Sequence, residues 1–307
     1  TARPLPLLAK MSAPNSIAFF IQASVSMTEV WFVGQLGSSS LAAMALVFPL
    51  LMLTQTLSAG AMGGAVASAI ARALGAGEPQ RAEQLIWHAL ALAVIGALLL
   101  FTLFWVFGAA FLRFLGGNND TLTEALRYCL VLFSGGVFLW FMGVVSAIYR
   151  GMGDMKFPAL VMAASALVQV PLSAALVLGA FGAPQLGIVA AAVSAVVTAF
   201  LLSGIMILRL IIGSTAIKIR RSRFGFEPQH FKEILNVALP ASLSPILTVT
   251  SILCLTAIVG RFGEEALAGY GIGSRIEFLL IPLVFGIGAS MTSLVGMSVG
   301  AGNLKRA

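Results

Sequence analysis

The chain alternates long runs of apolar residues with short segments rich in charged residues, glycine and proline. Each apolar run has about 20 residues or more, which lets an α-helix rising 1.5 Å per residue cross a hydrocarbon core of ~30 Å. The runs do not alternate apolar and polar residues, as the strands of a membrane β-barrel would. We therefore expect about eight membrane-spanning helices, at residues 11–36, 41–73, 84–112, 122–148, 157–180, 186–212, 231–260 and 266–300.

The composition supports this all-α polytopic membrane class. Of 307 residues, 59% are hydrophobic and 9% are charged, whereas about a quarter of the residues in a soluble domain are charged. Mean hydropathy is +1.02. These values exclude an ordinary soluble protein, a coiled coil and a disordered chain.

The positions of the positive charges predict the orientation of the chain. With a cytoplasmic N-terminus, the loops and span ends on the opposite side carry only Arg113, Arg127 and Arg261 out of 18 Lys and Arg. Cytoplasmic loops of membrane proteins are enriched in Lys and Arg. We expect the net charge of +7 to meet anionic membrane lipid on the cytoplasmic side, and we expect no nucleic-acid partner.

The end of the chain repeats its beginning. At an offset of 226, Pro14 matches Pro240 and Gly34 matches Gly260; after one deletion, Gly75 matches Gly300 and Arg81 matches Arg306. Six predicted spans separate the copies, so both enter the membrane in the same direction. A parallel repeat of this kind builds two-lobed secondary transporters whose site lies between the lobes.

The repeat predicts how the chain is divided. We expect an N-terminal lobe of six helices at residues 1–212, a basic cytoplasmic linker at 213–230, and the first two helices of a C-terminal lobe at 231–307. The second copy ends where the first continues for four more spans, so we expect the chain to be a fragment of a protein of two six-helix lobes.

Polar residues that break the repeat are the best candidates for chemistry, because the shared fold does not require them. Glu29 aligns with Leu255, and an acid at the centre of a membrane helix costs ~3 kcal/mol. Asn15, Gln22, Ser26 and Glu29 follow at steps of 7, 4 and 3, on one side of a helix. Carboxyl groups removed from water can exchange protons near neutral pH, which makes Glu29 the candidate proton-coupling residue.

A second polar stripe lies in the fifth predicted span. Ser165, Gln169 and Ser173 recur every four residues, so they share one helix face that could oppose the first stripe across a cavity. Trp31 could line the same cavity as an aromatic partner for a cation. Ordinary helix packing is the alternative for each of these residues.

The eighth predicted span carries two charged residues near its middle. Glu277 aligns with Leu51 in the other copy, and Arg275 lies two positions away. A separation of two points them to different faces of a helix. We expect them to contribute to a substrate cavity or to a structural ion-pair network.

Other chemistries find little support in the sequence. Cys129 and Cys254 lie within apolar runs, and His88 and His230 lie far apart, so we expect no disulfide, metal site or cofactor. An intramembrane enzyme would need a paired-acid metal motif or a nucleophile with its base. The sequence contains neither, and we expect no enzymatic activity.

Four segments resemble the multidrug and toxic compound extrusion (MATE) family, within the wider multidrug/oligosaccharidyl-lipid/polysaccharide exporter superfamily. The loop between the fourth and fifth spans is similar to the family's Arg-Gly-x-Gly-Asp-x-Lys-x-Pro pattern and reads YRGMGDMKFP (149–158). The other three segments are TEVWFVGQLG (28–37), RALGAGEPQRA (72–82) and GIGSRIEFLL (271–280).

The resemblance implies roles for particular residues. Glu29 occupies a position where many family members have an aspartate implicated in proton-coupled extrusion. Gln169 and Ser173 fall where the fifth span often has an asparagine and an aspartate, so the second acid is missing here. Thr248 replaces a glutamate of a subgroup coupled through the seventh span. Glu277 matches an acid present in part of the family.

The resemblance further implies a monomeric antiporter of the bacterial inner membrane. It would export small amphipathic organic cations in exchange for protons by alternating access. Sodium coupling and a lipid or lipid-linked oligosaccharide flippase are the alternatives. A flippase of this superfamily usually carries several basic residues in its cavity, whereas Arg275 is the only basic residue placed away from the ends of a predicted span.

Overall fold

The computed structural model describes residues 4–117, 119–179, 182, 184–213, 217, 225, 227–259 and 281–307. Every regular element in these ranges is helical, which confirms the predicted all-α class. The elements are α1 (Pro4–Gly34), α2 (Ser38–Gln55), η1 (Thr56–Met62), α3 (Gly63–Gly75), α4 (Pro79–Phe114), α5 (Asn119–Ser134), α6 (Gly136–Gly151), α7 (Lys156–Leu178), α8 (Val189–Ile212), α9 (Pro228–Val259) and α11 (Ile281–Gly300).

The predicted spans correspond to these helices. Six stretches of the described residues are long and apolar enough to cross a membrane, and a seventh is reached when the bent pair α5–α6 is counted as one span. The pair bends by 54° at consecutive glycines, Gly135 and Gly136, which is a common place for a kink. Of the predicted eighth span, the structure describes only the part that includes α11.

One span contains a local change of helix type. Helices α2 and α3 are joined without a turn by the π-helix η1. Such π-segments are rare and interrupt the regular backbone ladder. Helices α9, α3, α6 and α2 all pack against η1.

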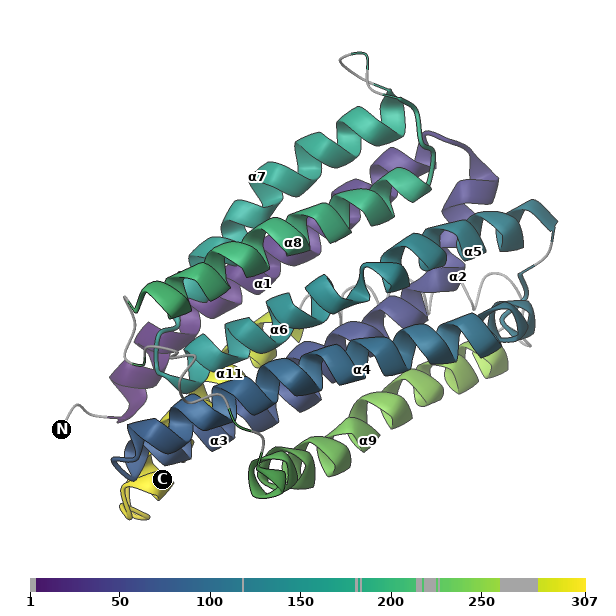
Figure 1. Ribbon diagram of the computed structural model, residues 1–307. Helices are drawn as coiled ribbons and strands as arrows, with labels where there is room; N and C mark the ends of the chain where they lie inside the picture. The colour runs from purple at the N-terminus through teal and green to yellow at the C-terminus, as the bar shows by residue number, and fades with distance from the viewer. Residues whose placement is uncertain are drawn as a thin grey trace.

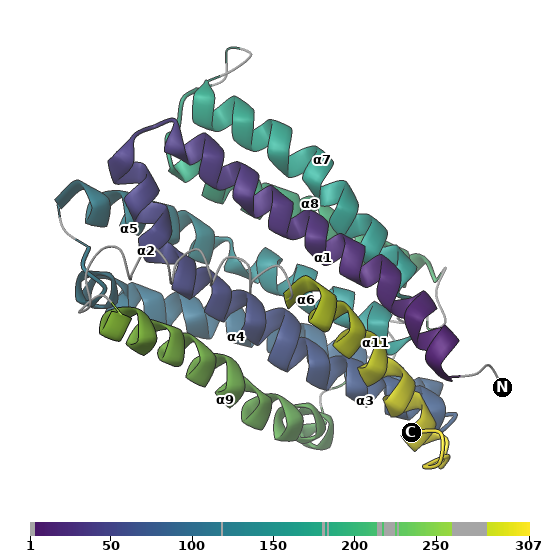
Figure 2. The same ribbon diagram turned by 180° about the vertical axis from the view of Figure 1, so that it is seen from behind.

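The helices form a bundle in which late segments pack against early ones. Helix α1 packs between α7 and α11, and α11 also packs on α3 (Figures 1 and 2). Helix α6 contacts α3, α4 and α8. The N-terminus, the C-terminus and the turn between α3 and α4 lie at one end of the bundle (Figure 1). We call this end the termini end.

Small residues let α3 and α11 approach closely at the termini end. A Cβ atom on Gly296 would lie 2.8 Å from the Cβ of Ala71. Side chains on Gly75 and Gly300 would overlap the backbone of Met297 and of Arg72, respectively. Close backbone approach through small residues is typical of helix contacts in membranes, and here it closes the termini end between α3 and α11.

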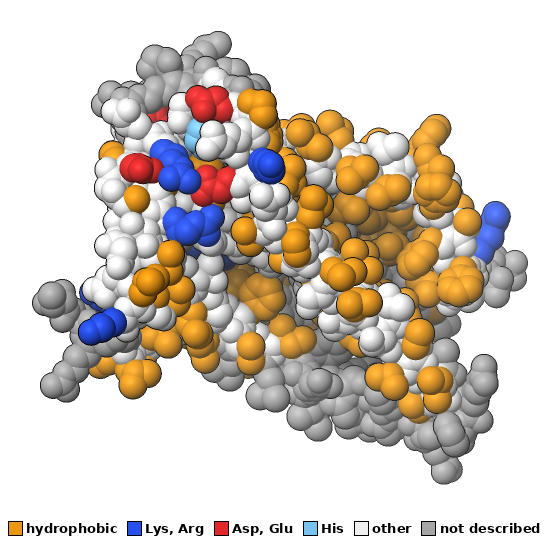
Figure 3. Space-filling view, turned by 90° about the horizontal axis from the view of Figure 1, so that it is seen from below, with side chains coloured by type: hydrophobic (Ala, Val, Ile, Leu, Met, Phe, Trp, Pro, Cys, Tyr) orange, Lys and Arg blue, Asp and Glu red, His pale blue; other side chains and the backbone are white. Residues whose placement is uncertain are grey.

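Surface and interior both fit a multi-pass membrane protein. The largest buried cluster joins α3, α4, α6 and α8 and contains many alanines together with Tyr149, Ile148 and Leu85. Large apolar side chains such as Leu167 and Trp105 are 80% and 72% exposed. In the view of Figure 3 the charged side chains gather mainly in one region, and the rest of the described face is largely hydrophobic. Such a surface is suited to lipid.

Candidate functional site

The predicted stripes on α1 and α7 face each other in the structure. Helix α1 packs along α7, and Gln169 Nε2 donates a hydrogen bond of 2.9 Å to Glu29 Oε1. Both side chains are buried, with 8% of Glu29 and 7% of Gln169 exposed. The acid thus lies between two helices, with a neutral amide as its hydrogen-bond donor.

Further polar contacts continue this line toward the termini end. Ser165 Oγ donates to the carbonyl of Met162 over 2.5 Å and lies 3.3 Å from Gln22 Oε1. Asn15 Nδ2 lies 3.2 Å from the sulfur of Met155, and Asn15 is 2% exposed. Three side chains of the α1 stripe therefore contact α7 or the residue preceding it.

Ser173 extends the line in the other direction. It lies one helical turn beyond Gln169, is fully buried, and its hydroxyl has no hydrogen-bond partner among the described residues. Pro171, between the two, cannot donate to the carbonyl of Leu167. This part of α7 therefore offers a buried hydroxyl one helical turn from the amide that binds Glu29.

The electrostatic setting of Glu29 is unusual for a buried acid. Within the described ranges, no Lys or Arg forms an ion pair with it. Tyr128 of α5, which is 3% exposed, lies within electrostatic reach of the carboxyl group. Charging a carboxyl group away from water is costly unless hydrogen bonds or opposite charges compensate. A single amide donor gives only partial compensation.

Ser26 of the predicted stripe and Trp31, predicted to line the same cavity, are not part of this contact. Ser26 is exposed, although its spacing places it near Glu29 along the helix. Trp31 is 60% exposed, and its ring lies 5.4 Å from that of Phe32. Arg275 and Glu277 lie outside the described residues.

Tyr128 is the residue near Glu29 that the sequence did not identify. It lies in an apolar run next to Cys129, and only the tertiary structure shows its position. Val30 and Val33 of α1 belong to the same buried cluster as Tyr128. A tyrosine within a membrane span was the available signal, because its hydroxyl needs a polar partner.

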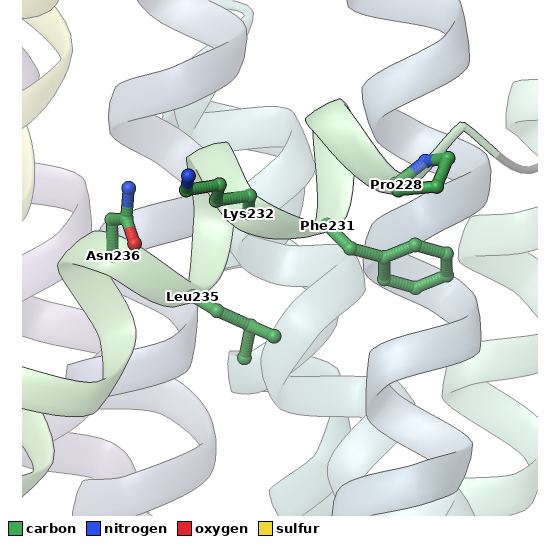
Figure 4. Close-up of a pocket in the computed structure, with 5 residues that line it drawn as sticks. All are labelled: Pro228, Phe231, Lys232, Leu235 and Asn236. Carbon is green, nitrogen blue, oxygen red and sulfur yellow. The ribbon is translucent and has the colours of Figure 1, made fainter.

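Two open grooves lie on α9, apart from the α1–α7 line. One, of about 480 Å³, is lined by Pro228, Phe231, Lys232, Leu235 and Asn236 (Figure 4). The other, of about 550 Å³, is lined by residues that include Ser244, Thr248 and Ser251. Thr248 is exposed there, and its hydroxyl donates to the carbonyl of Ser244, 2.9 Å away in the same helix.

Histidines distant in sequence come together at the start of α9. The rings of His88 and His230 lie 5.1 Å apart. A search of the described residues found no group of three or more His, Cys, Asp or Glu that could hold a metal ion.

Comparison with known proteins supports an exporter fold. A family model described as MatE matches residues 14–175 and 240–307. The two matched segments begin at Pro14 and Pro240, the prolines that the internal repeat aligns.

Similar curated proteins are described as transporters. The chain is 26% identical to a "FAD transporter" of Shewanella oneidensis over 98% of its own length and 66% of the relative's. It is 28% identical to "Probable multidrug resistance protein NorM" of Thermotoga maritima, over 96% of this chain and 63% of the relative. The chain thus spans about two thirds of the length of these relatives.

Solved structures of the same superfamily have the same fold. A MOP superfamily transporter from Pyrococcus furiosus, described as having a binding pocket of reverse polarity, matches with a TM-score of 0.92 at 26% identity; the match covers 99% of this chain and 67% of that one. An outward-facing multidrug resistance MATE family transporter matches with a TM-score of 0.91 at 26% identity, over 99% and 68%.

Proposed function

The chain belongs to the MatE family, and from this premise we propose that it exports amphipathic organic cations in exchange for protons. The observation that carries the proposal is the buried carboxyl group of Glu29, held by the amide of Gln169 and without a basic partner among the described residues. An acid in this setting can bind either a proton or a cationic ligand, and the two compete for it.

We infer the following cycle for this site. When Glu29 is ionised, its charge attracts an organic cation, while the buried Ser173 hydroxyl offers a further polar contact. A proton arriving from outside neutralises Glu29 and removes that attraction, so the cation leaves outward. Rocking of the two repeats then exposes the acid to the cytoplasm, where the proton leaves. A membrane potential favours proton entry by ~2.3 kcal/mol per charge per 100 mV.

The proposed orientation places the termini end in the cytoplasm, with the protein in the plasma membrane. Arg72, Arg81 and Arg150 belong to helices that end or begin there, and cytoplasmic segments are enriched in such residues. Glu29 lies near the opposite end of α1, five residues before Gly34. A proton that enters from outside therefore has a short path to Glu29.

The charge of the site favours a cation over an anion as cargo. Among the described residues, the polar contacts between α1 and α7 involve one acid, Glu29, together with amides and hydroxyls. Glu29 forms no ion pair with a described Lys or Arg. This setting disfavours a lipid phosphate or lipid diphosphate. The relative described as a FAD transporter makes an anionic dinucleotide the competing cargo to test.

Transport by the full-length protein in proteoliposomes tests the proposal. Ethidium and FAD would be offered separately, under an imposed pH gradient or an imposed sodium gradient. We expect ethidium movement driven by the pH gradient. FAD movement without ethidium movement would contradict a cationic cargo, and sodium-driven ethidium movement would contradict proton coupling.

A further inference from the structure

An ion-pair cluster at the termini end joins α9 to α3 and to the start of α4. Glu233 of α9 uses both carboxylate oxygens: Oε1 accepts from Arg72 Nη2 over 3.3 Å, and Oε2 accepts from Arg81 Nη2 over 2.9 Å. Arg81 Nη1 also donates to Glu78 Oε2 over 2.9 Å, and Arg72 Nη1 donates to Ser68 Oγ. Figure 3 shows acidic and basic side chains gathered together on this face.

A second set of contacts holds the segment just before Glu233. The backbone N–H of Glu227 donates to His88 Nε2 over 2.8 Å, and His88 Nδ1 lies 2.7 Å from the carbonyl of Gln84. His88 therefore carries its proton on Nδ1, because that nitrogen faces an acceptor and Nε2 faces a donor. Gln84 Nε2 also donates to Glu227 Oε1 over 3.4 Å. The start of α9 is thus positioned over α4 independently of the ion pairs.

The internal repeat shows that this contact is one-sided. The position equivalent to Glu233 in the first copy is Leu7, and the position equivalent to Glu78 in the second copy is Asn303. Arg306 is the equivalent of Arg81. The repeat-equivalent positions therefore lack both acids. The architecture shared by the two copies does not require the cluster. We therefore look for a function of Glu233 and Glu78 beyond maintaining the repeat fold.

We propose that Glu233 is an ionic latch that holds the termini end closed and releases when that end opens. The proposal rests on the alternating access proposed above, in which α9 and α11 move relative to the helices of the first copy. The side chains of Glu233, Arg72 and Arg81 are 18%, 31% and 43% exposed. Water can solvate these charges when they separate, so the latch can open reversibly, unlike a fully buried ion pair.

Distance measurements between two spin labels test the latch directly. We would replace Cys129 with alanine and Cys254 with serine in the full-length protein, then label Gln80→Cys and Gln229→Cys, both exposed and outside the cluster. Double electron–electron resonance would report the separation of α4 from α9. In Glu233→Gln we expect the ratio of separated to closed populations to rise about tenfold.

Arg306→Gln is the matched control, because it removes the repeat equivalent of Arg81 at a position without the acids. We expect the parental distance distribution for this variant. An unchanged distribution in folded Glu233→Gln protein, or an equal change in Arg306→Gln, would overturn the latch.

Salt provides a second test that needs no change in the cluster. Raising ionic strength screens partly exposed ion pairs, so the labelled parent should shift toward the separated population while Glu233→Gln stays constant. Equal salt responses of both proteins would contradict the proposal. These measurements need neither cargo nor an ion gradient, so a failure of proton-driven export would not be mistaken for a failure of the latch.

Discussion

Gln169 donates a 2.9 Å hydrogen bond to Glu29 across 140 positions of sequence, and this bond joins α7 to α1 in the buried part of the bundle. The amide can donate to Glu29 in either protonation state, but a charged carboxylate is the stronger acceptor. The bond therefore strengthens when Glu29 is ionised and weakens when it is protonated. The charge state of Glu29 on α1 therefore changes the strength of its contact with α7.

A double-mutant cycle tests whether Gln169 acts through Glu29. Gln169→Leu should reduce pH-driven ethidium export about tenfold, because an unpaired buried carboxylate costs more than one with a donor. In the Glu29→Gln background the same change should have little further effect, since coupled residues are non-additive. Initial export rates of the four proteins check this. If the fold-losses in export rate of the two single variants multiply in the double variant, the coupling is contradicted.

The contact between α3 and α11 depends on the absence of a side chain at Gly75. Gly75→Ala should lower the free energy of unfolding by about 2 kcal/mol, because the new Cβ would overlap the backbone of Met297. Gly64→Ala on the same helix is the control, since a Cβ there meets no atom within 4 Å. Thermal melting in detergent should separate the two variants. Equal melting temperatures would show that the helices move apart at little cost.

The hydroxyl of Tyr149 should contribute measurably to stability. The residue is fully buried, and its hydroxyl donates to the carbonyl of Met206 over 2.8 Å, joining α6 to α8. Tyr149→Phe should lower the free energy of unfolding by about 1 kcal/mol, because it removes a buried hydrogen bond between two helices while the Met206 carbonyl keeps its backbone partner within α8. Thr102→Val, which removes an exposed bond within α4, should change stability by less than about 0.5 kcal/mol. A Tyr149→Phe variant as stable as its parent would refute this account.

The sequence predicted the helical class and the span positions well because both follow from apolar length. The thickness of the hydrocarbon core sets the length of each spanning helix, so a run of about 20 apolar residues identifies a span on its own. The π-helix η1 and the bend at Gly135 were not predicted. Both depend on tertiary neighbours: α9 and α6 pack on η1, and a side chain on Gly135 would overlap Val196 of α8.

The candidate site was predicted in part for a similar reason. Helical periodicity placed Glu29 and Gln169 on polar faces, and the structure joins them. Periodicity could not show how each face is turned: Ser26 and Trp31 are exposed, whereas Glu29 and Gln169 are buried between α1 and α7. Contacts among distant side chains, such as those of Glu233 with Arg72 and Arg81, leave no local pattern in the sequence.

Replacing Glu29 with glutamine tests the central claim most directly. The change keeps the size of the side chain and removes its ability to bind and release a proton. Ethidium export by the full-length protein in proteoliposomes would be followed under an imposed pH gradient. Thr28→Val is the control, because among the described residues that hydroxyl donates to the carbonyl of Ser24 in its own helix. The account predicts that Glu29→Gln inserts normally but loses pH-driven export while Thr28→Val retains it; parental export by Glu29→Gln would contradict the account.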